Sequence, residues 1–155
     1  MDYNGIRLRI LNFLYQRHFD GQPMRYFELD EIIREAGLED ENRNVINGNA
    51  LYLYDKKLVA GTRQMGVAHP TSLYITASGI DFVEYVFDKT MQKMTLDQTN
   101  TTELQQIENE PDHPSQIRRF FTYVLGRPEL IKSYINIIIE EMGKHGHAAI
   151  MSGGS

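Results

Sequence analysis

The sequence predicts a mainly α-helical protein that carries one small β-hairpin and ends in further helices. Three observations lead to this fold class. Several segments repeat apolar residues at the three- and four-residue spacing of amphipathic helices. Two short runs rich in β-branched and aromatic residues flank a loop that contains glycine and proline. A polar stretch with two prolines then separates residues 1–87 from a second group of helical segments, so that the expected divisions are 1–87, 88–114, 115–144 and 145–155.

The first 57 residues contain three segments with helical periodicity, at residues 6–18, 28–36 and 43–57. Turn residues follow the first segment, and residues 24–27 form a short extended candidate before the second. Gly37 ends the second segment, because glycine adopts a left-handed conformation at low cost. Asn42 precedes the third segment and suits the N-cap position.

A hairpin is predicted from two strand-like runs, residues 58–63 and 72–76, which are joined by a long loop at residues 64–70. Ser78 and Gly79 then open a fourth helix, whose apolar residues continue to Phe87.

The composition changes after this point. Residues 88–114 are polar and are predicted as a solvated linker, or as a frayed helix around Leu104. Ser115 is expected to cap a helix that ends near Leu125, and a last helix is expected over residues 129–144. The glycine-rich residues 145–155 are expected to form a mobile tail.

Composition and charge exclude several classes of protein. The 155 residues are 41% hydrophobic and 24% charged, which is typical of a globular protein. No run approaches the length of a membrane span, the N-terminal residues lack signal-peptide features, and there is no cysteine, so a cytoplasmic protein without membrane contact is expected. The formal net charge is −5, with −3 in residues 1–87 and −2 in the remainder. Any nucleic-acid site must therefore be local.

Signals for catalysis are weak. The five histidines are scattered, and no nucleophile elbow, phosphate-binding loop or dinucleotide motif occurs. His145 and His147 flank a glycine in the expected tail, where metal binding would be adventitious. The sequence predicts a protein that is not an enzyme and that needs no metal or cofactor.

The order helix, strand, helix, helix, hairpin and helix is that of a winged helix-turn-helix domain. The corner Lys57-Leu58-Val59 and the stretch from Tyr74 to Phe82 resemble the corresponding motifs of MarR and PadR-like transcriptional regulators. This resemblance covers residues 1–87. It implies that residues 43–57 form a recognition helix and that residues 64–70 form the tip of a wing.

The resemblance therefore implies a site that binds duplex DNA. Long polar and guanidinium side chains read base edges, and asparagine can bond to adenine through two hydrogen bonds. With Ile46 buried, the helix offers five candidates to DNA and the wing offers two that would touch phosphates or the minor groove: Arg43, Asn44, Asn47, Gly48, Tyr52, Arg63 and His69.

Two observations favour an alternative, a winged-helix module that binds protein and not DNA. The turn before the recognition helix contains Glu39, Asp40 and Glu41, which would repel phosphates. Lys56 and Lys57 are the only lysines of the helix, and both lie at its far end. In this alternative the asparagines of the helix are solvated or capping residues.

The last helix carries an apolar stripe that cannot remain exposed. It packs within its own chain or pairs with a second chain, and a homodimer is preferred because two-fold symmetry places two recognition helices in successive grooves. The residues of this predicted dimer interface are Ile131, Tyr134, Ile135, Ile138, Ile139 and Met142.

Arg118, Arg119 and Arg127 form a second basic cluster, which is either a phosphate-contacting patch or a solvated helix face. A ligand pocket lined by methionine and tyrosine, between the winged domain and the C-terminal helices, is a third functional alternative.

Overall fold

The computed structural model describes residues 1–21, 25–97 and 101–153, and the side chains of these residues except 101 and 145–153. The protein is mainly helical with a small three-stranded antiparallel sheet, which confirms the predicted fold class. The chain forms two compact units, Met1–Ile80 and Asp81–Ser155. The division lies seven residues before the predicted one at Phe87, and both positions fall within helix α4 (Ala77–Leu96).

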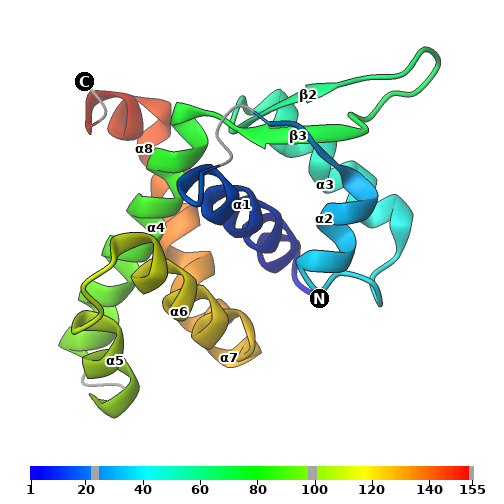
Figure 1. Ribbon diagram of the computed structural model, residues 1–155. Helices are drawn as coiled ribbons and strands as arrows, with labels where there is room; N and C mark the ends of the chain where they lie inside the picture. The colour runs from blue at the N-terminus through cyan, green and yellow to red at the C-terminus, as the bar shows by residue number, and fades with distance from the viewer. Residues whose placement is uncertain (22–24, 98–100, 154–155) are drawn as a thin grey trace. The chain divides into compact units, whose positions relative to one another are not determined.

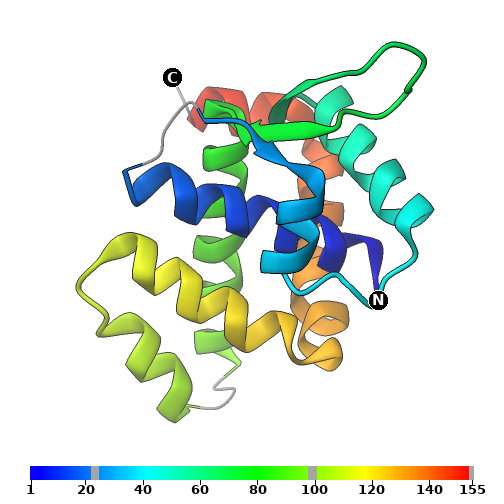
Figure 2. The ribbon, with the colours of Figure 1, turned by 45° about the vertical axis from the view of Figure 1, so that its right-hand side comes forward.

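Unit 1 has the element order of a winged helix (Figures 1 and 2). Before α4 its elements are α1 (Tyr3–Phe19), β1 (Phe27–Glu28), α2 (Leu29–Glu35), α3 (Arg43–Asp55), β2 (Val59–Thr62) and β3 (Ser72–Ile75). The strands lie in the order β1-β3-β2, with Phe27 opposite Leu73 and Val59 opposite Ile75. Pairing of β1 with β3 extends the predicted hairpin to three strands, and Met24 of the expected extended segment lies outside the described residues.

The ends of α3 follow from its local sequence. Asn42 is the N-cap, and its side-chain oxygen accepts hydrogen bonds from the backbone N–H groups of Asn44 (2.8 Å) and Val45 (3.3 Å). At the other end, Lys57 has a φ of +63°, a left-handed conformation that stops the helix and turns the chain into β2. Before α3, Gly37 has a φ of +72°, as predicted for a glycine after α2.

The corner between α3 and β2 is held against the first turn of α4. The Thr76 hydroxyl donates to the backbone oxygen of Lys57 (2.7 Å) and accepts from the backbone N–H of Gly79 (3.1 Å). A Cβ atom at Gly79 would lie 2.0 Å from the backbone oxygen of Leu58. Only glycine permits this close approach of two backbones.

Unit 2 contains the rest of α4 and a series of further helices. These are α5 (Thr101–Glu108), α6 (His113–Leu125), α7 (Pro128–Leu130), the π-helix η1 (Ile131–Ile135) and α8 (Asn136–Gly153). The last helix was expected to end near Lys144 and instead continues to Gly153, so a helix replaces most of the expected tail.

The prediction of a solvated linker at residues 88–114 was wrong for most of this stretch, which belongs to α4, α5 and the start of α6. The helix expected around Leu104 is present as α5. Four apolar side chains of the stretch are buried: Met91, Met94, Leu104 and Ile107. They recur at helical spacing within a polar background, so the composition concealed an amphipathic pattern.

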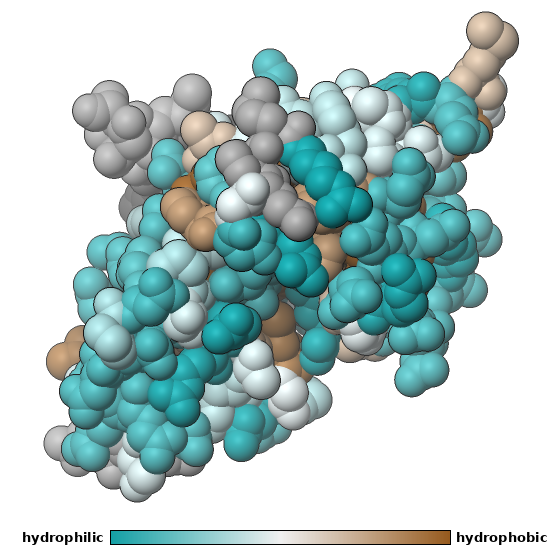
Figure 3. Space-filling view, in the orientation of Figure 1, coloured by the Kyte–Doolittle hydropathy of each residue, from teal (hydrophilic) through white to brown (hydrophobic). Residues whose placement is uncertain are grey.

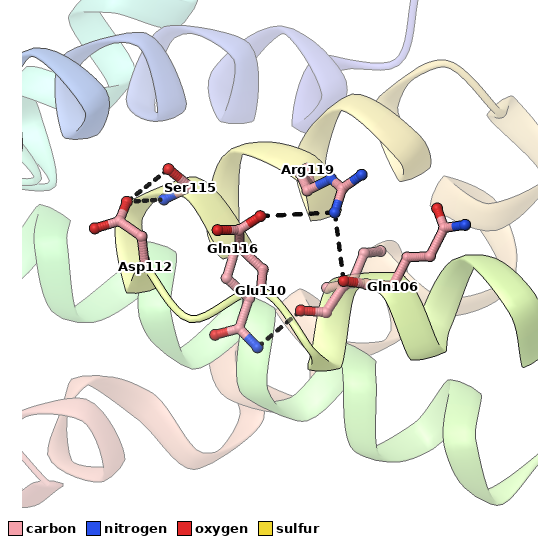
Figure 4. Close-up of polar contacts among 7 residues, drawn as sticks. Gln106, Glu110, Asp112, Ser115, Gln116 and Arg119 are labelled. Carbon is pink, nitrogen blue, oxygen red and sulfur yellow. Dashed lines mark hydrogen bonds and ion pairs between the residues drawn. The ribbon is translucent and has the colours of Figure 1, made fainter.

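Polar side chains fasten the turn between α5 and α6 (Figure 4). Asp112, and not Ser115, is the N-cap of α6, and its carboxylate accepts from the backbone N–H (3.0 Å) and the hydroxyl (2.6 Å) of Ser115. These hydrogen bonds stabilise the charged form and lower the pKa of the Asp112 carboxyl. Arg119 reaches back to the Glu110 carboxylate (3.6 Å) and to the backbone oxygen of Gln106 (3.4 Å).

The apolar stripe predicted as a dimer interface is largely covered within one chain. Five of its six side chains are buried and Ile139 is half-buried. The Tyr134 hydroxyl also donates to the Asp97 carboxylate (2.9 Å). The stripe is thus largely shielded from solvent without a second chain. This favours the alternative that it packs within its own chain.

Among the described residues, no helix is both long and apolar enough to span a bilayer.

Candidate nucleic-acid interface

Helix α3 and the hairpin β2–β3 bring the predicted DNA-binding residues onto the surface of unit 1. We call the exposed side chains of residues 43–57, together with those of the hairpin loop at residues 63–71, the α3–wing surface. In both ribbon views the hairpin loop projects beyond the helices of unit 1 (Figures 1 and 2). The major groove of DNA is wide enough to admit an α-helix or a two-stranded β-ribbon, and unit 1 presents one of each.

Arg43 and Asn47 lie together on the side of α3 that faces α2. The Arg43 guanidinium donates to the Asn47 side-chain oxygen through Nε (3.1 Å). Its Nη1 atom forms an ion pair with the Asp30 carboxylate of α2 (2.7 Å). Both charged side chains remain more than half exposed, so water screens the pair and it contributes little to stability.

Asn44 and Gly48 are exposed on the outward face of α3, as predicted. No atom lies within 4 Å of the position that a Cβ of Gly48 would take, so another backbone can approach the helix there. Asp55 shares this outward side near the end of the helix and is also exposed. The outward face therefore offers amide groups at its start and a carboxylate at its end.

Tyr52 serves mainly to attach α3 to α1. The Arg7 guanidinium of α1 lies 3.6 Å from the centroid of the Tyr52 ring, at the distance of a cation–π contact. Arg7 also donates to the side-chain oxygen of the buried Asn49 (2.8 Å), whose amide in turn donates to the backbone oxygen of Val45 (2.8 Å). Tyr52 keeps 38% of its surface exposed, so one part of the side chain stays available on the α3–wing surface.

Arg63 connects the wing to the end of α3. Its guanidinium lies 4.7 Å from the centroid of the Tyr54 ring, and the side chain is exposed. His69, near the other end of the loop, is half-buried. A backbone hydrogen bond from Thr71 to Thr62 (2.8 Å) closes the loop at its base.

Two tyrosines lie edge to face beside the strands of unit 1. The ring centroids of Tyr26 and Tyr74 are 4.7 Å apart. Desolvation and the neighbouring Tyr74 raise the pKa of the Tyr26 hydroxyl, so this group is neutral at physiological pH. Tyr26 thus adds no negative charge to unit 1.

Charge is segregated along unit 1. Residues 28–41, which form α2 and the following turn, contain seven carboxylates and one arginine, a net charge of −6. Residues 42–80 contain four lysine or arginine side chains and one carboxylate, Asp55, a net charge of +3. Residues 56–80 form the longest stretch of the sequence without a carboxylate. The Asp30 carboxylate of α2 offsets the charge of Arg43, so Lys56, Lys57 and Arg63 are the cations that leave the α3–wing surface locally cationic in a protein whose net charge is −5.

Sequence reasoning missed the partners of the predicted residues. Asp30 and Arg7 come from other helices, and only the packing of the helices brings them to Arg43 and Tyr52. The position of Tyr54 could have been predicted from the sequence, because Tyr54 lies seven residues after Asn47 and therefore on the same side of α3.

Among the described residues, no group of three or more His, Asp or Glu side chains is placed to hold a metal ion. The side chains of His145 and His147 lie outside the described part of the protein. Comparison with protein-family models, curated proteins and solved structures finds no match.

Proposed function

We propose that this protein binds duplex DNA through the α3–wing surface and acts as a cytoplasmic transcriptional regulator. The charge segregation of unit 1 is the observation that carries the proposal: a net charge of +3 is gathered on the helix and the projecting hairpin. A polyanion is attracted to such a local field even when the whole protein is acidic.

In this proposal α3 enters the major groove with its N-terminal half. Asn44 reads base edges, and the open surface at Gly48 lets the helix approach the DNA backbone closely. Lys56, Lys57 and Arg63 neutralise phosphates at the far end of the helix and at the base of the wing.

Asp30 competes with DNA for Arg43 in this proposal. The guanidinium that would contact a base or a phosphate is held by the Asp30 carboxylate at 2.7 Å. Replacement of that carboxylate by a neutral amide frees Arg43 and removes a negative charge beside α3. We therefore expect Asp30→Asn to bind DNA more tightly than the unaltered protein, and Arg43→Ala to bind more weakly.

The test is fluorescence anisotropy of labelled duplex DNA, titrated with the full chain at low and at physiological salt. We expect binding that weakens steeply with salt, because bound cations release counterions from the DNA. Arg63→Ala should reduce the slope of log affinity against log salt by about 0.9, the value for one phosphate contact. Lys132→Ala removes one exposed positive charge from unit 2 and serves as the matched control, which should leave the slope unchanged.

Absence of binding at low salt, or an equal change of slope in the Arg63 and Lys132 variants, contradicts the proposal. The first result would favour the second candidate function, a protein-interaction module. The exposed Asp55 on the outward face of α3 and the acidic residues 28–41 support that candidate, since a cationic protein surface would complement them.

Dimerisation through the stripe of α8 and η1 is not part of the proposal, because that stripe is largely buried within one chain. A homodimer that uses another surface remains compatible with DNA binding, and light scattering of the purified chain measures its mass directly.

A further inference from the structure

The loop of the wing carries an apolar side chain that buries no surface within the described part of the protein. Met65 is 102% exposed, and no other large apolar side chain among the described residues exceeds 81%. Figure 3 shows this end of the hairpin, at the upper right, as a hydrophobic projection above a mainly hydrophilic surface. Isolated exposed apolar residues are common on proteins, but this one lies in a loop that projects beyond the helices of unit 1 (Figures 1 and 2).

A tight turn explains why Met65 points outward. The backbone N–H of Val67 donates to the oxygen of Gln64 (3.1 Å), which closes a four-residue turn with Met65 at its second position. Gly66 occupies the third position with a φ of +81°, the geometry of a type II turn. The second residue of such a turn lies at the corner, so its side chain projects away from both strands.

The surroundings of Met65 fit a polyanion better than an apolar protein surface. Residues 56–80 contain no carboxylate, and the exposed cation Arg63 stands at the base of the same loop. The neighbours Gly66 and Ala68 are small and exposed, so the tip is narrow. Proteins that bind the minor groove combine cationic side chains with an apolar wedge, which enters between two base pairs and kinks the duplex.

We propose that Met65 is such a wedge, which enters a flexible base step from the minor groove and bends the DNA. This inference rests on the proposed function, because it needs the α3–wing surface to bind duplex DNA. Pyrimidine–purine steps such as TA unstack most easily, and the wedge should prefer them to stiff A-tracts. Met65 would then contribute specificity for deformable DNA without a hydrogen bond to any base.

The test uses two short duplexes, one with a central TA step and one with an A-tract. A fluorescent adenine analogue, whose emission is quenched by stacking, replaces one central adenine in each duplex. We expect the unaltered chain and Met65→Leu to raise the emission of the TA duplex. Met65→Ala should bind without raising the emission, and its affinity for that duplex should fall about tenfold, the factor that burial of one methionine side chain supplies.

Leu96→Ala is the matched control, because Leu96 is 81% exposed, the next highest value for a large apolar side chain among the described residues, and belongs to the part of α4 in unit 2. It should behave as the unaltered chain does. If Met65→Ala raises the emission as the unaltered chain does, the wedge is overturned while DNA binding stands. If the unaltered chain binds neither duplex at low salt, the proposed function fails and the wedge fails with it.

Discussion

Both units of this protein contain several helices, but the sequences that form these helices differ in character. In unit 1, turn and cap residues such as Gly37, Asn42 and Gly79 mark the ends of the elements, and the apolar residues are dense. In unit 2 the apolar residues of α4 and α5 are separated by polar ones, and polar side chains fasten the α5–α6 turn. The comparison shows that polarity of a segment is a poor guide to its burial. A few apolar side chains at helical spacing are sufficient to place a helix in a core.

The largest expected effect concerns the two glycines that differ most in their surroundings. Gly79→Ala should lower the free energy of unfolding by about 3 kcal/mol, because its Cβ would lie 2.0 Å from a backbone oxygen and one of the two backbone segments would have to shift. Gly48→Ala has no atom within 4 Å of its Cβ and should raise that free energy by about 0.5–1 kcal/mol, since alanine favours the helix. Urea denaturation followed by circular dichroism measures both, and equal effects would contradict the close approach at Gly79.

In unit 2 the stripe of η1 and α8 provides the corresponding test. Ile135 is fully buried, and Ile135→Ala should cost about 2–3 kcal/mol of unfolding free energy without changing the molecular mass in solution. Ile137→Ala removes the same atoms from a side chain that is 38% exposed and should cost much less. A variant at Ile135 that keeps its stability but halves the mass would restore the stripe as a dimer interface.

Removal of a helix cap, one in each unit, should lower the free energy of unfolding by a smaller amount. The pH dependence of this loss distinguishes the two caps. Asn42→Ala should destabilise the protein by about 1 kcal/mol at every pH, because the amide cap of α3 does not titrate. The pKa of the Asp112 carboxyl is lower in the folded than in the unfolded chain, so its stabilisation is present at neutral pH and is lost as pH falls through the folded pKa. The difference between Asp112→Ala and the unaltered chain should therefore shrink in acid, as thermal unfolding at several pH values will show. A difference that persists in acid would mean that the Asp112 charge does not matter.

The smallest effect is expected at the end of α3. Lys57 holds a left-handed backbone at φ +63°, and Lys57→Gly should raise the unfolding free energy by about 0.5 kcal/mol because glycine adopts this conformation without strain. Lys56 has an ordinary helical conformation at the adjacent C-cap, and Lys56→Gly should lower the unfolding free energy by a similar amount. Both variants remove one positive charge, so both should weaken DNA binding. Changes of the same sign in stability would rule out strain at Lys57.

Most of the fold of unit 1 was predictable because its signals are local. The three helices, the hairpin and the glycine after α2 follow from periodicity, caps and turn residues. Pairing of β1 with β3 was not predictable, since a two-residue strand has no periodicity of its own. In unit 2 the prediction of a linker failed because the spacing of Met91, Met94, Leu104 and Ile107 was outweighed by the polar residues between them.

The candidate site was predictable as a set of residues but not as a set of contacts. Asn44 and Gly48 are exposed on the outward face of α3 because a helix fixes their direction once Ile46 is buried. The ion pair of Arg43 with Asp30 and the stacking of Arg7 on Tyr52 depend on how helices pack, which no local pattern encodes.

The exposure of Met65 also has a chemical consequence. Peroxide oxidises a methionine thioether to the sulfoxide, a polar group, and solvent access controls which methionine reacts. Met91, Met94 and Met142 are buried, whereas Met65 is fully exposed, so mild oxidation should convert Met65 well before these three. A change of two electrons at a single sulfur atom would then replace the apolar tip of the wing by a polar one while the interior of the protein stays reduced.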